Sequence, residues 1–389
     1  MRPDEIRALG DLLGEAATGI ADQARGVHEA VAGRVFGALR GAGLPVAPVR
    51  AAHDAIAAVS CGAARELTGG IVRGGAFAGA AAWGAWRPDA PALGSGGRGR
   101  VVLGVLGGAF GDRLAARGSP LYTSLELFVD DARGVTDRLA VFIHGLGETE
   151  RAWRLHERRV TPYGDRLAVE CGVTPVYVRY NSGLPITVSG EQLAVALDEL
   201  VQGWPASEVE ISLIGHSMGG LVARAACRAD GEGRWRGRVR RTISLGSPHT
   251  GAPLARAART AEYALSSLPE TRPFASPLRA RSAAVHGLAG GLRTPFLESA
   301  DHYFLAASVG SDPDGLPGRV LGDLLVRTPS AWAQDTRAER LSVDRSHHHH
   351  HLAGAHHFDL LGHPAISDLI AGWFTDGPTQ LRGRLFSVS

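Results

Sequence analysis

The segment that decides the fold is VEISLI at 209–214, followed by Gly215-His216-Ser217-Met218-Gly219 and a helical run that extends to about Ala229. A serine hydroxyl is a poor nucleophile unless it is exposed, oriented and deprotonated as it attacks. A sharp strand-to-helix turn exposes it, and glycine on either side removes Cβ atoms that would clash in the bend. The N-terminus of the following helix favours developing negative charge. The segment therefore predicts a nucleophilic Ser217.

On either side of this turn the chain alternates between short apolar runs and helical patterns. The apolar runs are LAVFI at 139–143, TPVYVRY at 174–180, Val239–Leu245 and Tyr303–Val309. Strands that alternate with helices over this length are typical of a mostly parallel sheet covered by helices on both faces. A final helix follows Pro364, because the apolar residues between Ile366 and Phe374 share one helical face. The fold class is therefore α/β.

A second glycine-rich turn, His144-Gly145-Leu146-Gly147, ends the apolar run at 139–143. An enzyme that transfers acyl groups must stabilise an oxyanion with preorganised N–H groups, and a glycine-rich turn lets the backbone approach the site closely. The two donors that we expect are the backbone N–H groups of Met218, just after the nucleophile, and Leu146.

A serine on such a turn also needs a base and an acid that orients the base, which follow it along the chain in the order serine, acid, histidine. His357 lies just before the last helix, where a base is expected, and spacing alone leaves its neighbour His356 open. Asp323 follows the penultimate strand region and is the favoured acid. Asp312 and Asp314 are the alternatives, although they stand in a Pro/Gly turn where aspartate is common for structural reasons.

With these residues in place, the chain from about Leu139 to Phe374 resembles bacterial lipases and esterases of the α/β-hydrolase superfamily. The motifs that carry the resemblance are HGLG at 144–147, GHSMGG at 215–220, GSPHTGAP at 246–253, GDLLV at 322–326 and HHFDLLGHP at 356–364. The segment GDRLAARGSPL at 111–121 is similar to a helical extension of actinobacterial relatives.

The resemblance implies a role for each matching residue. Ser217 would be the nucleophile, Asp323 the acid and His357 the base, while Leu146 would supply an oxyanion N–H. Enzymes of this kind need no cofactor. The resemblance says nothing about the role of the helical N-terminal extension.

The sequence also divides into zones of different composition. Residues 1–100 are rich in Ala, Gly and Arg and are expected to form a helical N-terminal extension with a linker, in which 27–39 and 49–67 are the clearest helical runs. The α/β-hydrolase domain would then occupy 101–389. The proline-rich insertion at about 250–300 is too long for a structureless loop and is expected to form a helical cap or lid.

Composition narrows the possible partners and the compartment. The net charge is +2, and without a basic stripe it gives no indication of nucleic-acid binding. The three cysteines, widely spaced, fit neither a disulfide framework nor a zinc site, which favours a cytoplasmic protein. No signal peptide is evident at the N-terminus. Gly69–Trp86 is the most membrane-like stretch, but it is too weakly apolar to predict a span, so only peripheral membrane contact stays open.

Together these features predict an esterase or lipase that acts on a small-molecule or lipid ester through a Ser217–Asp323–His357 triad. A thioesterase or a lipid acyl hydrolase with the same triad is one alternative, and a catalytically silent lipid-binding protein is another. The five consecutive histidines His347–His351 are interpreted as a solvated loop rather than a metal site.

Overall fold

The computed structural model describes residues 1–229, 233–267, 269, 271–273, 275, 281–310, 322–334 and 347–375. The chain divides into two compact units. The first, here called the helical unit, comprises Met1–Gly99, Ala116–Leu121 and Ala257–Arg281. The second, called the sheet unit, comprises Arg100–Ala115, Tyr122–Arg256 and Ser282–Ser389.

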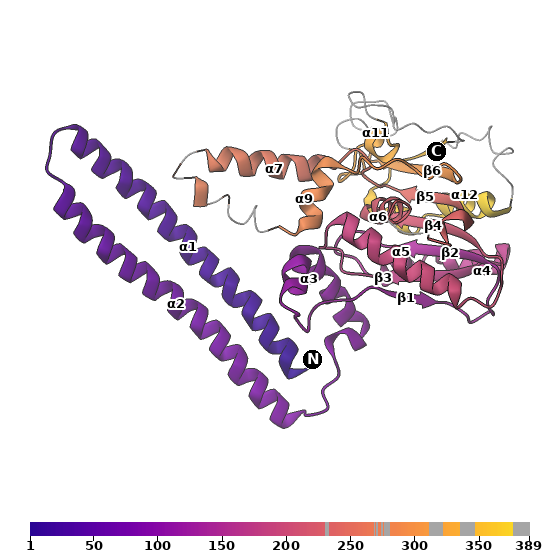
Figure 1. The fold of residues 1–389 in the computed structure, drawn as a ribbon, viewed down its shortest axis with the longest axis horizontal. Helices are drawn as coiled ribbons and strands as arrows, with labels where there is room; N and C mark the ends of the chain where they lie inside the picture. The colour runs from indigo at the N-terminus through magenta and orange to yellow at the C-terminus, as the bar shows by residue number, and fades with distance from the viewer. Residues whose placement is uncertain are drawn as a thin grey trace. The chain divides into compact units, whose positions relative to one another are not determined.

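The helical unit is built on a hairpin of two long helices, α1 (Pro3–Gly41) and α2 (Ala47–Trp86), which pack along each other (Figure 1). Both extend well beyond the helical runs expected at 27–39 and 49–67. Small residues let the two backbones approach closely, since a Cβ atom added to Gly10 would lie only 2.1 Å from the Cβ atom of Ala76. An ion pair between Asp22 and Arg65 joins the helices at 3.0 Å.

The sheet unit contains one sheet of seven strands within the described residues, in the order β1-β3-β2-β4-β5-β6-β7. Its strands are β1 (Glu126–Val129), β2 (Arg138–Ile143), β3 (Thr174–Arg179), β4 (Glu210–His216), β5 (Val239–Leu245), β6 (Asp301–Ser308) and β7 (His347–Ala353). Only the edge strand β1 is antiparallel to its neighbour, and the other pairs are parallel. The expected mostly parallel sheet is therefore confirmed.

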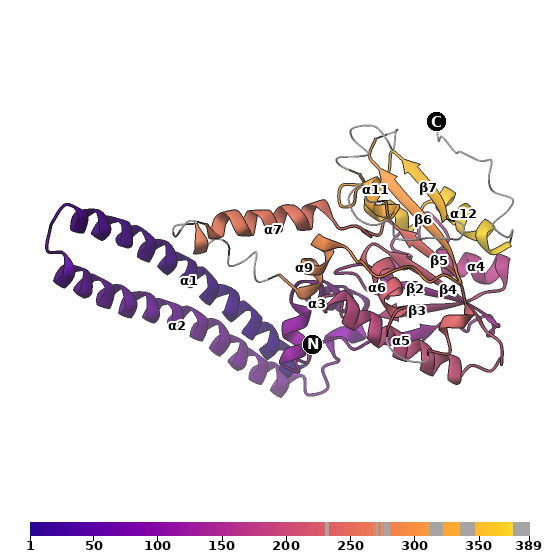
Figure 2. The same ribbon diagram turned by 45° about the horizontal axis from the view of Figure 1, so that its top comes forward.

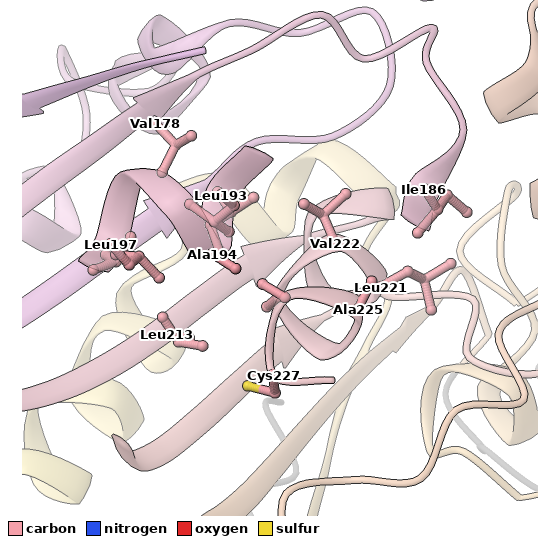
Figure 3. Close-up of a cluster of buried hydrophobic side chains, with 14 of the residues drawn as sticks. Val178, Ile186, Leu193, Ala194, Leu197, Leu213, Leu221, Val222, Ala225 and Cys227 are labelled. Carbon is pink, nitrogen blue, oxygen red and sulfur yellow. The ribbon is translucent and has the colours of Figure 1, made fainter. Parts of the chain in front are cut away.

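Helices cover both faces of this sheet, as Figure 2 shows, so that strand residues are buried on either side. The covering helices are α4 (Tyr163–Cys171), α5 (Ile186–Gln202), α6 (Met218–Ala226) and α12 (Pro364–Thr375). Val141 of β2 belongs to the core under α5 and α6, while its neighbour Phe142 belongs to the core under α4 and α12. Figure 3 shows part of the first core, which includes Leu193 of α5, Leu221 of α6 and Leu213 of β4.

Shorter elements connect these layers. They are η1 (Leu93–Ser95), α3 (Gly97–Ala116), η2 (Glu150–Arg154), η3 (Arg236–Arg238), α7 (Pro253–Ser266), α9 (Ala283–Gly290), α11 (Thr328–Ala331) and η4 (His357–Leu361). Helices α7 and α9 lie in the insertion at about 250–300. The sequence boundary at residue 100 falls inside α3.

The histidine run was misinterpreted as a solvated loop, because the structure places it in strand β7, paired in parallel with β6. Its rings find aromatic partners: His348 stacks on Tyr303 at 4.7 Å between ring centroids, and His350 lies 5.1 Å from Trp373. Burial lowers the pKa of His350 to about 4, and the neighbouring histidines add to the effect. The strand covers the edge that β6 would otherwise expose.

Candidate active site

The turn between β4 and α6 holds Ser217 in a strained backbone conformation, with φ 53° and ψ −123°. A positive φ is rare for a residue with a side chain and is found where the surroundings enforce it. Here the Ser217 N–H donates to the Leu245 carbonyl at 2.8 Å, which ties the turn to β5. Gly219 is needed for close packing, because a Cβ atom there would lie 2.1 Å from the Ile143 carbonyl oxygen. Ser217 is half-exposed while its chain neighbours are buried.

The glycine-rich turn after β2 lies beside this serine. A Cβ atom added to Gly145 would be 3.0 Å from the Ser217 Cβ atom. Two N–H groups of the turn already have acceptors: Gly145 donates to Glu148 Oε2 at 2.7 Å, and Gly147 donates to Ser182 Oγ at 2.9 Å. The N–H of Leu146 between them has no acceptor within the described part of the chain.

The N–H of Met218 lies on the first turn of α6, where helical N–H groups have no partner within the helix. Together with Leu146, it can donate to an atom next to Ser217. The structure therefore brings the two expected oxyanion donors and the expected nucleophile to the same ends of β2 and β4.

Asp323 and His357 form a buried pair, with 2.6 Å between Asp323 Oδ2 and His357 Nδ1 and with side chains only 1% and 3% exposed. The other carboxylate oxygen of Asp323 accepts from the N–H groups of Leu325 at 3.0 Å and Val326 at 2.8 Å. The acid is therefore fixed by three contacts. His357 Nε2, at the far side of the ring, is buried and has no hydrogen-bond partner among the described residues.

His356, the alternative base, lies away from Asp323. His356 is about half-exposed, and its Nε2 lies 3.2 Å from Asp359 rather than near Asp323. Its position as N-cap of the short helix η4 gives it a structural role. Asp312 and Asp314 lie outside the described residues.

The acid–base pair lies next to the nucleophile turn. A Cβ atom at Gly246, at the end of β5, would be 3.1 Å from His357 Cε1 and 3.2 Å from Asp323 Oδ2. The His357 ring also lies 4.7 Å from the ring of His216, the residue before Ser217, measured between centroids. The described structure contains no hydrogen bond between Ser217 and His357, a contact that often forms only when substrate is bound.

Sequence reasoning missed one residue of this region, Glu148, which pairs with His216. Glu148 Oε1 lies 2.9 Å from His216 Nδ1, with side chains 12% and 0% exposed. Burial opposes charge on both groups, but their attraction outweighs it: the pKa of Glu148 is lowered and the pKa of His216 is raised. Because Glu148 also accepts from Gly145, one carboxylate links the glycine-rich turn to the nucleophile turn. The acidic residue directly after HGLG was the available signal.

A second buried charge lies further along α6. Arg224 is 4% exposed, and its guanidinium nitrogens have no hydrogen-bond partner in the described structure. It lies over the ring of Phe296, 4.0 Å from the ring centroid. Burial, with a smaller contribution from Arg228, lowers the pKa of Arg224 to about 10.

A mostly parallel sheet with a serine on the turn from a central strand to a helix is the arrangement of the α/β-hydrolase fold, which the sequence predicts. Among the described residues, no group of three or more His, Cys, Asp or Glu side chains is arranged to hold a metal ion.

A family model described as a PGAP1-like alpha/beta domain matches residues 195–266, which include the nucleophile turn. No curated protein sequence matches this chain significantly.

The solved structures similar to this chain include bacterial lipases and esterases. The Bacillus licheniformis lipase BlEst2 in its propeptide form is 18% identical, with a TM-score of 0.46, over 68% of this chain and 55% of that chain. Its mature form is 19% identical, with a TM-score of 0.43, over 64% of this chain and 98% of that chain. The carboxylesterase CesB from Bacillus subtilis is 13% identical, with a TM-score of 0.37, over 71% and 99% of the two chains. The chain thus spans just over half of the lipase's propeptide form.

Proposed function

We propose that this chain is a serine hydrolase that cleaves carboxylic esters through an acyl-enzyme intermediate. The observation that carries the proposal is the buried Asp323–His357 pair, whose unpartnered His357 Nε2 lies in the region of the strained Ser217 turn. An aspartate on Nδ1 holds the imidazole in the tautomer whose Nε2 can accept a proton.

In the first half of the reaction, Ser217 Oγ attacks the ester carbonyl while His357 Nε2 accepts the serine proton. Asp323 stabilises the imidazolium that forms. The tetrahedral oxyanion accepts hydrogen bonds from the N–H groups of Leu146 and Met218, and the α6 N-terminus adds a favourable dipole. His357 then protonates the leaving alcohol as the C–O bond breaks.

In the second half, a water molecule replaces the alcohol. His357 takes a proton from that water as its oxygen attacks the acyl carbonyl of Ser217. Collapse of the second tetrahedral intermediate releases the carboxylic acid and returns the proton to Ser217. No group other than these side chains and N–H donors is required.

The test is labelling by a fluorophosphonate probe, together with hydrolysis of p-nitrophenyl esters from acetate to palmitate. We expect Ser217→Ala to abolish both, and Ser207→Ala, at an exposed serine of the same unit, to change neither. Undiminished labelling of Ser217→Ala would contradict the proposal. The ester chain length with the highest kcat/KM distinguishes an esterase from a lipase, and turnover of palmitoyl-CoA instead of esters would indicate a thioesterase.

A further inference from the structure

Helix α2, which is 40 residues long, presents a row of large apolar side chains to solvent between Val49 and Phe77. At 100° per residue, six large apolar side chains fall within an arc of about 120°. They are Val49, Ile56, Val59, Leu67, Ile71 and Phe77, each at least 60% exposed. We call this arc the α2 stripe. The charged residues of α2 all lie outside it: Arg50, Asp54, Arg65, Glu66 and Arg73.

The hairpin leaves most of the stripe exposed, and the contact that α1 makes with it is that of Arg7, which lies over the Phe77 ring at 5.8 Å from the centroid. The residues of α2 that are buried are Gly69 and Ala80, on the other side of the helix, where Ala76 also meets α1. Single exposed apolar residues are ordinary on protein surfaces, but a continuous stripe marks a binding surface. From Val49 to Phe77 the α2 stripe extends over about 42 Å at 1.5 Å per residue.

The charge around the stripe suits an anionic surface. Residues 30–87 contain six arginines and only two carboxylates, whereas residues 1–29 contain three arginines and six carboxylates. Only Arg50, Arg65 and Arg73 of these arginines belong to α2, which also holds both carboxylates, Asp54 and Glu66. The excess of positive charge therefore lies at the two ends of α2, where Arg34 and Arg40 of α1 stand near the turn of the hairpin and Arg87 follows the helix. Basic residues next to an apolar helix face are typical of helices that bind anionic lipids.

The end of α2 carries side chains that favour a membrane interface. Trp86 is 70% exposed, and the Arg87 guanidinium lies 5.6 Å from the Trp86 ring centroid and 5.9 Å from that of Trp83. Tryptophan and arginine are enriched at the level of lipid headgroups, where an aromatic body and a charged end are both accommodated.

Among the described residues, α2 is the helix long and apolar enough to cross a membrane. A surface orientation suits α2 better, because even its most apolar stretch, Gly69–Trp86, would place Arg73 in hydrocarbon if it crossed the membrane. A second copy of the chain is the other conceivable occupant. The stripe suits it poorly, since Gly70 and Gly74 stand where a helix pair in water needs large side chains.

We propose that α2 binds along the surface of an anionic phospholipid membrane, with the α2 stripe facing the acyl chains and the arginines facing the headgroups. This anchoring does not depend on the proposed ester hydrolysis. It would hold the chain at a lipid surface whether or not Ser217 is reactive.

The test is co-flotation of the full-length protein with ether-linked vesicles, which an esterase cannot degrade. One set contains equal phosphatidylglycerol and phosphatidylcholine, and the other phosphatidylcholine alone. The stripe variant is Ile56→Gln/Leu67→Gln/Ile71→Gln, because glutamine preserves helix propensity. The matched control is Val169→Gln/Val195→Gln, at two residues of the sheet unit that are also 60% exposed. Circular dichroism and thermal melting verify folding of each variant.

We expect wild type and control to float with the anionic vesicles, and the stripe variant to bind at least about tenfold more weakly. Binding to pure phosphatidylcholine vesicles should be about tenfold weaker than binding to anionic vesicles, and the two affinities should become equal in high salt. Three results would overturn the proposal. These are no flotation of wild type, equal flotation of the stripe variant, and resistance of the bound protein to alkaline carbonate extraction, which would indicate a spanning helix. A dimer in light scattering that the stripe substitutions dissociate, without vesicle binding, would assign the stripe to a second copy.

Discussion

Replacing Glu148 by glutamine tests whether the buried Glu148–His216 pair stabilises the site. At an effective dielectric constant of about 20, opposite charges as close as these attract by about 6 kcal/mol. Desolvation of both groups cancels much of this attraction, and removing one partner of a buried pair costs about 3–5 kcal/mol. Glutamine keeps the shape and can still accept from Gly145, so we expect the free energy of unfolding to fall by about 2–3 kcal/mol.

The pH dependence of this loss of stability shows whether the Glu148–His216 ion pair is its cause. His216 has a raised pKa, so its contribution is complete below the ordinary value of 6.5 and is lost as pH rises through the folded pKa. Glu148 has a lowered pKa, so its contribution is complete above its ordinary value of 4.5 and is lost as pH falls through the folded pKa. The difference between wild type and Glu148→Gln should therefore be largest at pH 4.5–6.5 and shrink in alkaline solution.

Urea unfolding followed by tryptophan fluorescence, repeated from pH 5 to pH 9, measures this difference. Glu150→Gln is the matched control, since that carboxylate stands two residues away, is as buried as Glu148, and pairs with Arg179 at 2.8 Å. We expect its cost to change little from pH 5 to pH 9, because arginine stays charged over this range and the pKa of Glu150 is lowered. A Glu148→Gln difference that is below 1 kcal/mol, or that stays constant with pH, would refute the reasoning.

Three further predictions follow from the geometry. Asp323→Asn should lower kcat on p-nitrophenyl acetate by about 10⁴, because the His357 imidazole is then held in the wrong tautomer. His356→Ala should retain most of the activity. Equal losses of activity in the two variants would contradict the assignment of His357 as the base. Arg224→Met should raise the free energy of unfolding by about 1–3 kcal/mol, measured by urea unfolding. The substitution removes a buried guanidinium that has no hydrogen-bond partner in the described structure, while methionine keeps contact with Phe296. A destabilised variant would show that the charge of Arg224 is compensated. His350 has a folded pKa of about 4 against an ordinary 6.5, so the unfolded chain binds a proton first as pH falls, and the free energy of unfolding should drop by about 3 kcal/mol as pH falls from 6.5 to 4. His350→Phe should reduce this loss in thermal melts, and an unchanged pH dependence would argue against it.

The centre of the sheet could be predicted from sequence because local pattern and tertiary environment agree there. The run at 209–214 is apolar, β-branched and followed by glycine, so it matches a buried central strand that ends in a turn, and β4 lies there. The nucleophile turn depends on residues adjacent in sequence. The pairing of Asp323 with His357 joins distant segments, and only the expected chain order pointed to it.

Other features depend on contacts that no local pattern reports. Strand β7 is a run of histidines, a residue with little β-propensity, and it forms a strand because β6 needs a partner and Tyr303 and Trp373 offer surfaces for its rings. The role of Glu148 arises from its approach to His216, which lies far away in sequence. Helices α1 and α2 extend through Gly- and Ala-rich sequence with low periodicity, so their ends were underestimated.

The chain order of the candidate site has a consequence for biosynthesis. The oxyanion turn is made first, the nucleophile about seventy residues later, and His357 only near the C-terminal end, in the short helix η4. Because a ribosome synthesises the chain from its N-terminus, a nascent polypeptide can expose the α2 stripe long before it contains a base for Ser217. A chain truncated before η4 would therefore keep its proposed membrane anchor while lacking the proposed hydrolase activity. The proposed membrane anchor is therefore synthesised before the proposed catalytic base.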